Sequence, residues 1–289
     1  MKLVQVVTGL QFMTKRKVNN TIITTTIKPN KLSIQVSLNG LSFCILNTIE
    51  NRVIQSENVV FKQELNPYNL LQELQTILEN HKIPAQEFAE VIVIHKNSLF
   101  SLVPTPLFNP KELESYLNFN TKILANDLLV YEEIENQEIV AVYVPFVNIN
   151  NYIYDLFGEF TYKHHSTVMV HTLLNNTQPP KEETCYVHVS DKQLDITVIA
   201  HKKLLLHNSF LYETKEDFIY YILFTLEQLK LDPENVILKL FGSIETEDNL
   251  YSICYKYIKN ITLFIPNNPY HPIEEFNNKS IDFTVLNAL

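Results

Sequence analysis

The feature that most limits how this chain can fold is an order of predicted elements that occurs twice. The first copy starts at Leu32, where apolar residues alternate with polar ones as in a half-buried strand. Two more strands follow, then a helix opened by Pro67 and an apolar strand from Glu90. This unit of three strands, a helix and a further strand predicts one compact α/β half.

The second copy starts at Cys185 and has the same order of elements. Its first strand ends at Ser190, which lies 153 residues after Ser37, the end of the first strand in the first copy. Val91 and Val236, in the last strands of the two copies, are 145 residues apart. Two units with matched order and nearly constant separation indicate an internally duplicated fold.

Both copies predict a hairpin between their first two strands. In the first copy the turn signal is Asn39-Gly40, a sequence that favours tight hairpins. In the second copy the turn runs from Ser190 to Gln193 and contains no glycine. Only four glycines occur in all 289 residues. Loops that hold phosphate through backbone N–H groups usually need glycine, so this chain is poorly equipped for them.

Between the copies the sequence predicts a strand at 98–104, a helix capped by Asn109, a hairpin around Glu135-Asn136 and a helix over 149–157. The polar stretch 175–184 contains two consecutive prolines and reads as a boundary. We therefore divide the chain into an extension (1–28), a first half with inserted elements (29–178) and a second half (179–289).

This duplicated pattern resembles the actin-like ATPase fold shared by actin, Hsp70, sugar kinases and pilus-assembly ATPases. The chain also resembles one bacterial family in particular, named domain of unknown function 3822 (DUF3822). The stretches that carry this resemblance are "LSIQVSLNGLSFCI", "SLFSLVPTPLF" and "VHVSDKQLDITVI". The resemblance extends from about residue 29 over nearly the whole chain. It implies an α/β, ribonuclease H-like fold: two βββαβα halves that flank a cleft.

In active members of the superfamily, the resemblance implies an acid on each hairpin and glycines that let the backbone reach phosphate. Here Gln35 stands at the first acidic position and His188 at the second, while Ser190, Asp191 and Lys192 replace glycines. The last acid of the second motif, Asp195, is kept, and the adenosine-binding position keeps Gly242 beside Ser243.

We therefore expect no catalytic residue and only vestigial cofactor-binding positions in the cleft. Asp191 would place negative charge where a triphosphate should lie. The expected positions are Asn39, Gly40, Asp191, Asp195, Gly242 and Ser243.

Other candidate sites are weak. His164-His165 could suggest a metal ligand pair, but neighbouring strand residues point in opposite directions and no adjacent acid or cysteine completes a set. Glu132-Glu133, with Glu135 and Glu138, could suggest paired carboxylates for acid–base work, but these residues flank the predicted hairpin turn and indicate a solvated edge. A ribonuclease H-like nuclease would need a carboxylate cluster on its first strands, which carry Gln35 and His188 instead.

The composition limits the classes of partner and the cellular compartment that we expect for this protein. The net charge of −9 and the lack of a basic patch disfavour nucleic acid. No apolar run approaches the length of a membrane span, and three scattered cysteines (Cys44, Cys185 and Cys254) predict buried thiols in a reducing compartment, so we expect a cytoplasmic protein. Translation could begin at Met1 or at Met13. The aromatic-rich stretches "NNYIYDLFGEFTY" and "FIYYILF" suggest an unidentified protein partner or self-association.

Two functions follow. The first is a non-catalytic, cytosolic binding or scaffold module with degenerate nucleotide loops, for which we expect no cofactor. The alternative is a divergent ATPase or small-molecule kinase that holds Mg-ATP in the cleft through Asp195 and Gly242.

Overall fold

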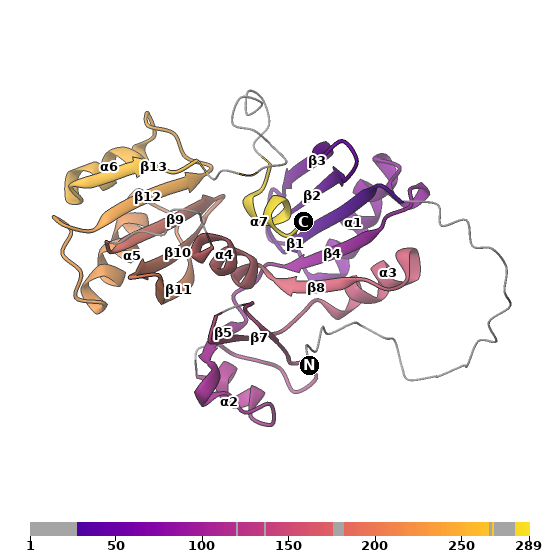
Figure 1. Ribbon diagram of the computed structural model, residues 1–289, viewed down its shortest axis with the longest axis horizontal. Coiled ribbons are helices and arrows are strands. Elements are labelled where there is room, and N and C mark those ends of the chain that lie inside the picture. Colours follow the sequence, from indigo (N-terminus) through magenta and orange to yellow (C-terminus); the bar gives the residue numbers. More distant parts are fainter. Residues whose placement is uncertain (1–27, 120, 136, 176–181, 266–267, 269–280) are drawn as a thin grey trace, which may run out of the picture.

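Two five-stranded sheets stand side by side in this computed structural model (Figure 1). The structure describes residues 28–119, 121–135, 137–175, 182–265, 268 and 281–289. The sheets have strand orders β3-β2-β1-β4-β8 and β11-β10-β9-β12-β13, so one order repeats the other. The predicted duplication is confirmed.

The first half follows the predicted order of elements. Its core elements are β1 (Asn30–Ser37), β2 (Gly40–Asn47), β3 (Arg52–Val60), α1 (Pro67–Asn80), the 3-10 turn η1 (Ile83–Ala85), β4 (Glu90–His95) and β8 (Thr161–His164). Strands β1 to β3 are antiparallel, and β4 lies parallel to β1. Asn66 caps α1 by accepting a hydrogen bond from the Asn69 N–H, and Pro67 occupies the first turn, where its missing N–H costs nothing.

The second half repeats this arrangement. Its elements are β9 (Thr184–Ser190), β10 (Gln193–Ala200), β11 (Lys203–Leu211), α5 (Lys215–Gln228), β12 (Ile237–Gly242), α6 (Asn249–Tyr257) and β13 (Asn260–Leu263). Thr214, the N-cap of α5, forms a capping box with Asp217. Hydrogen bonds with the Thr214 side chain and with the backbone N–H groups of Thr214 and Glu213 lower the pKa of the Asp217 carboxyl.

The repeat extends to individual hydrogen bonds. The Ser37 hydroxyl donates to the Gly40 carbonyl at 3.0 Å, and the Ser190 hydroxyl donates to the Gln193 carbonyl at 3.3 Å. The residues after β4 and β12 are likewise equivalent. The Lys96 N–H donates to Val36 at 2.9 Å, and the Ser243 N–H donates to Val189 at 2.8 Å.

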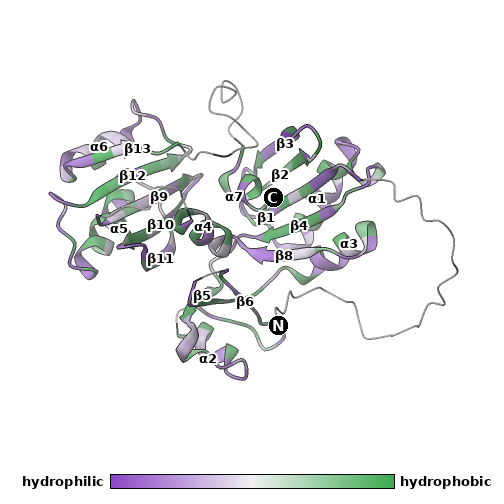
Figure 2. Ribbon diagram, viewed as in Figure 1, coloured by the Kyte–Doolittle hydropathy of each residue, from purple (hydrophilic) through white to green (hydrophobic). Residues whose placement is uncertain are grey.

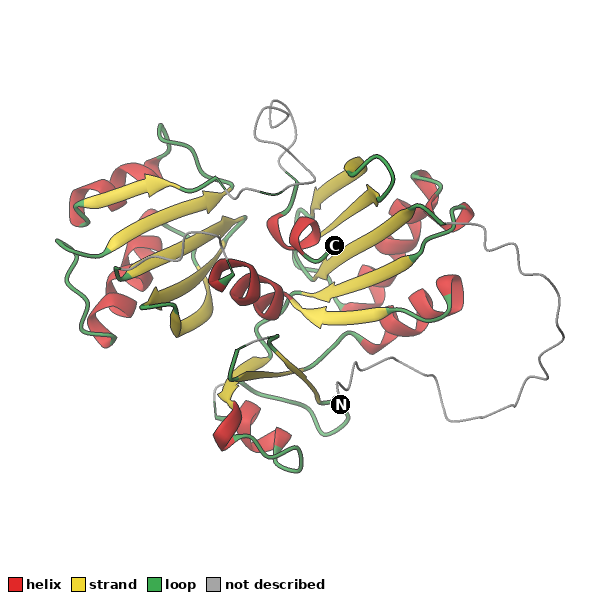
Figure 3. Cartoon of the chain, viewed as in Figure 1, coloured by secondary structure: helices red, strands yellow, loops and turns green. Residues whose placement is uncertain are grey.

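Each sheet carries its own core on the face covered by helices (Figures 2 and 3). In the first half, alternate residues of β1 pack against the apolar face of α1. In the second half, alternate residues of β9 and β10 pack against α5 and α6. Period-two strands facing period-3.6 helices therefore build both cores, as the sequence predicts. All three cysteines are buried and free.

A three-stranded sheet with order β5-β7-β6 is inserted into the first half. It is formed by β5 (Phe100–Pro104), β6 (Val130–Glu133) and β7 (Ile139–Tyr143), and it carries the 3-10 turn η2 (Thr105–Leu107) and α2 (Leu113–Asn118). The predicted hairpin is confirmed, although Asn136 itself lies outside the described residues. The prediction that Asn109 caps α2 is wrong. The Asn109 side chain closes a preceding turn by accepting from the Lys111 N–H, and the helix starts only after Glu112.

Two of the remaining helices, α4 (His165–Leu174) and α7 (Phe283–Asn287), lie between the sheets (Figure 1). Helix α3 (Val147–Phe157) confirms a predicted helix and leads into β8, which is followed by α4 (His165–Leu174). Helix α4 is buried along most of its length, with Met169 against the second sheet and Val168 against the first. The short C-terminal helix α7 (Phe283–Asn287) returns to the first sheet, where Val285 packs near Cys44.

The predicted domain boundaries stay a prediction. Most of the boundary segment 175–184 lies outside the described residues. Helix α7, although it belongs to the last stretch of the chain, contacts β1, β2 and α4.

Gly242 should be irreplaceable because two constraints coincide there. Its φ is +92°, and a Cβ would lie 2.3 Å from the Val189 carbonyl oxygen and 2.9 Å from the His188 ring. Gly158 has a similar φ of +77° but open space around the missing Cβ. We expect Gly242→Ala to lower the free energy of unfolding by at least ~1 kcal/mol more than Gly158→Ala, since overpacking adds to backbone strain. Urea denaturation of both variants measures this, and equal losses would contradict it.

Candidate functional site

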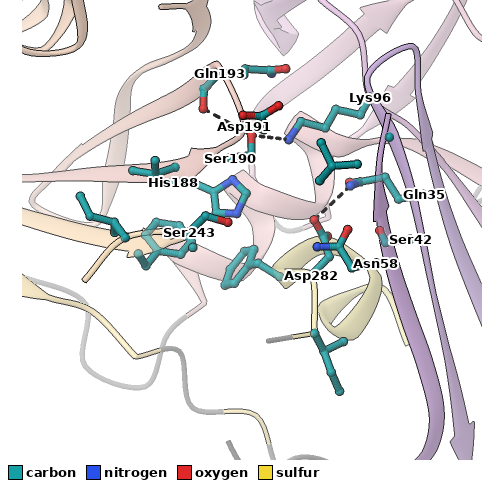
Figure 4. Close-up of a pocket in the computed structure, with 18 of the residues that line it drawn as sticks. Gln35, Ser42, Asn58, Lys96, His188, Ser190, Asp191, Gln193, Ser243 and Asp282 are labelled. Carbon is teal, nitrogen blue, oxygen red and sulfur yellow. Dashed lines mark hydrogen bonds between the residues drawn. The ribbon is translucent and has the colours of Figure 1, made fainter. Parts of the chain in front are cut away.

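A cavity of about 510 Å³ lies between the two halves. It is bounded by the β1–β2 hairpin, the β9–β10 hairpin, the ends of β3 and β12, and the C-terminal segment that contains α7 (Figure 4). Its volume is within the range of small-molecule pockets. The two hairpins face it because each leaves its sheet at the same edge.

The cavity brings together most of the vestigial positions predicted from the sequence. Asn39, Gly40, Asp191, Gly242 and Ser243 all line it. Asp195 does not: it lies behind the wall, only 1% exposed. No ligand contact tests a binding role for these residues, which stays a prediction.

The first hairpin is tighter than predicted. Its two-residue turn is Leu38-Asn39, and Gly40 already belongs to β2, paired with Val60. A Cβ on Gly40 would lie 2.6 Å from the Val59 carbonyl oxygen. The glycine is therefore required by the close approach of β3 rather than by a positive φ in the turn.

The second hairpin turns without glycine. Lys192 adopts a φ of +53°, the left-handed conformation that a glycine would adopt at lower cost. The Ser190 hydroxyl, besides donating within the hairpin, accepts a hydrogen bond from Lys96 Nζ at 3.1 Å. Because Lys96 belongs to the first half, this contact joins the two halves across the floor of the cavity (Figure 4).

Asp195 is the centre of a buried polar network. Its carboxylate accepts from Ser209 Oγ at 2.6 Å and from Gln193 Nε2 at 2.9 Å, and it lies 3.7 Å from Lys96 Nζ. Two imidazoles complete its surroundings, with His188 Nδ1 at 3.2 Å and His165 Nε2 at 3.5 Å. Burial by itself would raise the pKa of this carboxyl, but Lys96, His165 and His188 hold it well below the usual value. Asp195 is therefore a buried anion whose donors come from both halves.

A second polar cluster joins the C-terminal segment to the first sheet. Gln35 Nε2 donates to Asp282 Oδ2 at 3.1 Å (Figure 4), and the Thr284 hydroxyl donates to the side-chain Oε1 atom of Gln35. Asp282 also caps α7 by accepting from the Thr284 N–H at 2.9 Å. Gln35, which stands at an acidic position of the active motif, thus holds a carboxylate from the far end of the chain.

The histidine pair is not arranged as predicted. His164 ends β8 and caps α4 by accepting from the Ser166 N–H, while His165 is the first residue of that helix. Both rings are fully buried, and their centroids are 4.5 Å apart, so they do not point in opposite directions along a strand. Among the described residues no group of three or more His, Cys, Asp or Glu side chains could hold a metal ion.

Buried imidazoles surround this junction. Burial lowers the pKa of His95 to about 4 and that of His207 to about 3. It also lowers the pKa values of His164 and His165, whose neighbouring rings add to the effect. These four rings are therefore neutral at pH 7, and His165 faces Asp195 as a neutral donor.

Glu132 is not the solvated edge residue that the sequence suggested. Its carboxylate accepts from the His164 N–H at 2.6 Å and from Thr167 Oγ1 at 2.8 Å. Burial raises the pKa of Glu132 to about 7, although these hydrogen bonds oppose the change. Glu132 fixes the start of α4 to the inserted sheet. Glu133 and Glu135 are exposed, as predicted.

Sequence reasoning missed Lys96 and Asp282. Lys96 could have been found, because it follows β4 at the position equivalent to Ser243 in the repeat. Asp282 carries no such signal, since it belongs to a segment outside the duplicated units.

One family model matches residues 19–261, and its description is "protein of unknown function (DUF3822)". This chain belongs to the DUF3822 family. The match covers both sheets and confirms the resemblance seen in the hairpin sequences. No protein of curated function matched the chain.

Solved structures establish the fold of this DUF3822 protein. A Bacteroides thetaiotaomicron protein with an actin-like ATPase fold and unknown function superposes with a TM-score of 0.71 at 23% identity, covering 84% of this chain and 94% of that one. A type IV pilus biogenesis complex, PilM–PilN, has a TM-score of 0.49 at 14% identity, covering 84% of this chain and 89% of that one. The ethanolamine utilization protein EutJ from Carboxydothermus hydrogenoformans has a TM-score of 0.47 at 7% identity, covering 82% of this chain and 85% of that one. The first of these shows that the chain has the actin-like ATPase fold.

None of the described helices is both long and apolar enough to cross a membrane.

Acidification should destabilise this protein already at pH values well above the pKa of an ordinary carboxyl group. Histidine side chains in an unfolded chain have a pKa of about 6.5. In the folded protein, burial lowers the pKa values of His95, His164 and His207 far below this. Below pH ~6.5 the unfolded state binds more protons, so the free energy of unfolding falls as the pH falls. Glu132 opposes this trend because its pKa is raised. We expect a net loss of at least ~2 kcal/mol between pH 7 and pH 5, measured by urea denaturation.

Two variants test the cause of this pH dependence. His207→Gln keeps an acceptor for the Thr197 hydroxyl and should reduce the loss. His201→Asn, at an exposed turn with positive φ, should leave it unchanged. If the free energy of unfolding falls equally between pH 7 and pH 5 in His207→Gln and in the unaltered protein, His207 does not cause the loss.

Asp195→Asn should be strongly destabilising because it leaves the Lys96 ammonium, 8% exposed, without its counter-ion. We expect a loss of about 3–5 kcal/mol, against less than ~0.5 kcal/mol for Asp155→Asn on the exposed face of α3. The double variant Lys96→Met with Asp195→Asn should recover much of the loss. A double-mutant cycle in urea measures the coupling, and strictly additive losses would refute the ion pair as the cause.

Proposed function

We propose that this DUF3822 protein is a non-catalytic member of the actin-like fold that works by binding, and that its cleft does not hydrolyse nucleotide. The observation that carries the proposal is the position of Asp195. A carboxylate that positions a metal-bound water has to face the cavity with free oxygen lone pairs. Asp195 instead lies behind the cavity wall, and donors from both halves already surround its two oxygens.

The charges that line the cavity also support the proposal. Asp191, Glu245 and Asp282 line it, and Lys96 is the one Lys or Arg among the described lining residues. Lys96 is already compensated by Asp195. A triphosphate brought against three carboxylates would meet repulsion that no free cation offsets.

Exposed aromatic residues on the second half fit a role in binding a protein partner. Tyr220 on α5 is 58% exposed and Tyr257 on α6 is 55% exposed, and both line a groove between these helices. Tyr220 stacks on Phe224, with ring centroids 5.8 Å apart. Tyrosine and phenylalanine are enriched in protein interfaces, so this surface suits an unidentified partner or a second copy of the chain.

A second candidate function, a divergent ATPase or small-molecule kinase, is favoured by the cavity itself. Its volume and its place between the two hairpins would suit a nucleotide. Under this alternative, Asp195 would have to leave Lys96 to reach a metal ion, which costs the free energy of that buried pair.

Thermal unfolding with Mg-ATP, Mg-ADP and Mg-GTP at millimolar concentration separates the two candidates. We expect an unchanged Tm and no phosphate release above the buffer blank. A nucleotide present at 100 times its Kd would stabilise the fold by ~2.7 kcal/mol and raise the Tm by several degrees. A saturable rise together with phosphate release would favour the second candidate. An actin-like protein that hydrolyses ATP serves as the positive control.

A further inference from the structure

Asp282 is a carboxylate that faces the cavity without a cation. Its Oδ2 atom accepts one hydrogen bond, from Gln35 Nε2. Its Oδ1 atom accepts from the Thr284 N–H at 2.9 Å, from the Thr284 hydroxyl at 2.6 Å and from the Val285 N–H at 3.3 Å. In the described part of the chain no Lys, Arg or His nitrogen lies within ion-pair distance of it. Burial alone would raise its pKa, but Lys96 and His188 lower it, so Asp282 is ionised at neutral pH.

Two polar side chains near Asp282 are incompletely paired. The Thr284 hydroxyl has one hydrogen but two acceptors, the Asp282 carboxylate and the side-chain Oε1 atom of Gln35. Ser42, 1% exposed and opposite Gln35 in the sheet, is one of the residues that line the cavity, and its buried Oγ atom has no hydrogen-bond partner. Asn58, opposite Ser42 on β3, lines it as well. Figure 4 shows Gln35, Asn58 and Asp282 together on this side of the cavity, opposite His188.

A buried hydroxyl without a partner carries an unfavourable free energy that a bound donor or acceptor would relieve. The ionised carboxylate of Asp282 favours a donor that is positively charged. An ammonium group would meet both observations, the carboxylate without an ion-pair partner and the Ser42 hydroxyl without a hydrogen-bond partner.

The rest of the cavity offers mainly hydrocarbon. Leu240, Phe241, Leu263, Phe264 and Ile265 form much of the wall on the second half. The rings of Phe241 and Phe283 meet there, with centroids 5.1 Å apart. A ligand that fills the cavity must therefore combine a polar, positively charged end with an apolar body.

We propose that this cavity binds a small organic cation, a primary amine with an alkyl or aromatic body. The ammonium group donates to Asp282 and to Ser42, and the body packs against the apolar wall. The inference rests on the proposed function, since it needs a cleft that no nucleotide occupies. Anionic ligands are disfavoured because the Lys96 ammonium is already bound to Ser190 and lies beside Asp195.

Matched ligands of one shape test the charge requirement. Isothermal titration calorimetry on the full chain compares hexylamine, hexanol and hexanoate at pH 7, with phenethylamine for the aromatic body. We expect hexylamine to bind at least ~10-fold more tightly than hexanol, the ratio for one charged hydrogen bond, and hexanoate not to bind. Equal affinity for hexylamine and hexanol, or tighter binding of hexanoate, would overturn the proposal.

Variants locate the site. Asp282→Asn keeps the size of the side chain and should weaken hexylamine binding at least ~10-fold. Because Asp282 also caps α7, Ser42→Ala provides a second test that touches no other hydrogen bond, and it should weaken binding about 3-fold or more. Asp155→Asn, an exposed position on α3, should leave the affinity unchanged. Normal affinity in a folded Ser42→Ala variant and in a folded Asp282→Asn variant would refute the site.

The same titrations distinguish failure of the inference from failure of the proposed function. If hexylamine does not bind and Mg-ATP does not bind, the inference is wrong and the non-nucleotide cleft stands. If Mg-ATP binds and displaces hexylamine, the proposed function is wrong, and hexylamine is only a competitor at a nucleotide site. If Mg-ATP binds and hexylamine does not, both proposals fail.

Discussion

The contact between Lys96 and Asp195 is the interaction on which the rest of this molecule depends. Lys96 follows β4 in the first half, and Asp195 lies on β10 in the second. Neither charge could be buried alone, because desolvation of a single ion costs several kcal/mol. Their pairing therefore requires the two halves to close against each other in one register. The same closure brings the β1–β2 and β9–β10 hairpins together around the cavity.

Burying this pair has consequences for the groups around it. His165 and His188 reach Asp195 from two more elements, α4 and β9. Burial lowers the pKa of His165, and its neutral ring adds no further charge to this buried interface. The junction between β8 and α4 is thus held by histidines that remain neutral at pH 7. The cost of this arrangement is sensitivity to acid, since protonated rings have no place in the fold.

The two ends of the cavity differ in how their carboxylates are compensated. Asp195 lies 3.7 Å from Lys96 Nζ, so that end serves the structure. Asp282 accepts hydrogen bonds but has no ion-pair partner in the described part of the chain, and the Ser42 hydroxyl has no hydrogen-bond partner, so that end is open to a cationic ligand. This difference supports binding over catalysis. The remaining glycines also serve the fold: Gly40 and Gly242 allow backbones to approach more closely than any Cβ permits.

The sequence by itself determined the architecture, because hydrophobic periodicity and turn residues act locally and were written twice in the same order. The strands, α1, α5 and the caps at Asn66 and Thr214 follow from neighbours within a few residues. It also identified the hairpins that line the cavity. The turn at Gly40 was misplaced because its requirement comes from β3, a strand that the local pattern does not place against it.

Only the tertiary structure decided the chemistry of the site. Lys96 and Asp195 are 99 residues apart in the sequence, and Gln35 and Asp282 are 247 apart. Neither pair leaves a mark on the local pattern, because an ion pair or a buried hydrogen bond depends on which surfaces meet. Glu132 and the two histidines were misjudged for the same reason: a polar residue near a turn is solvated or buried according to what packs over it. The duplicated sequence specified two halves, and their closure determined which polar groups were paired and which were left for a ligand.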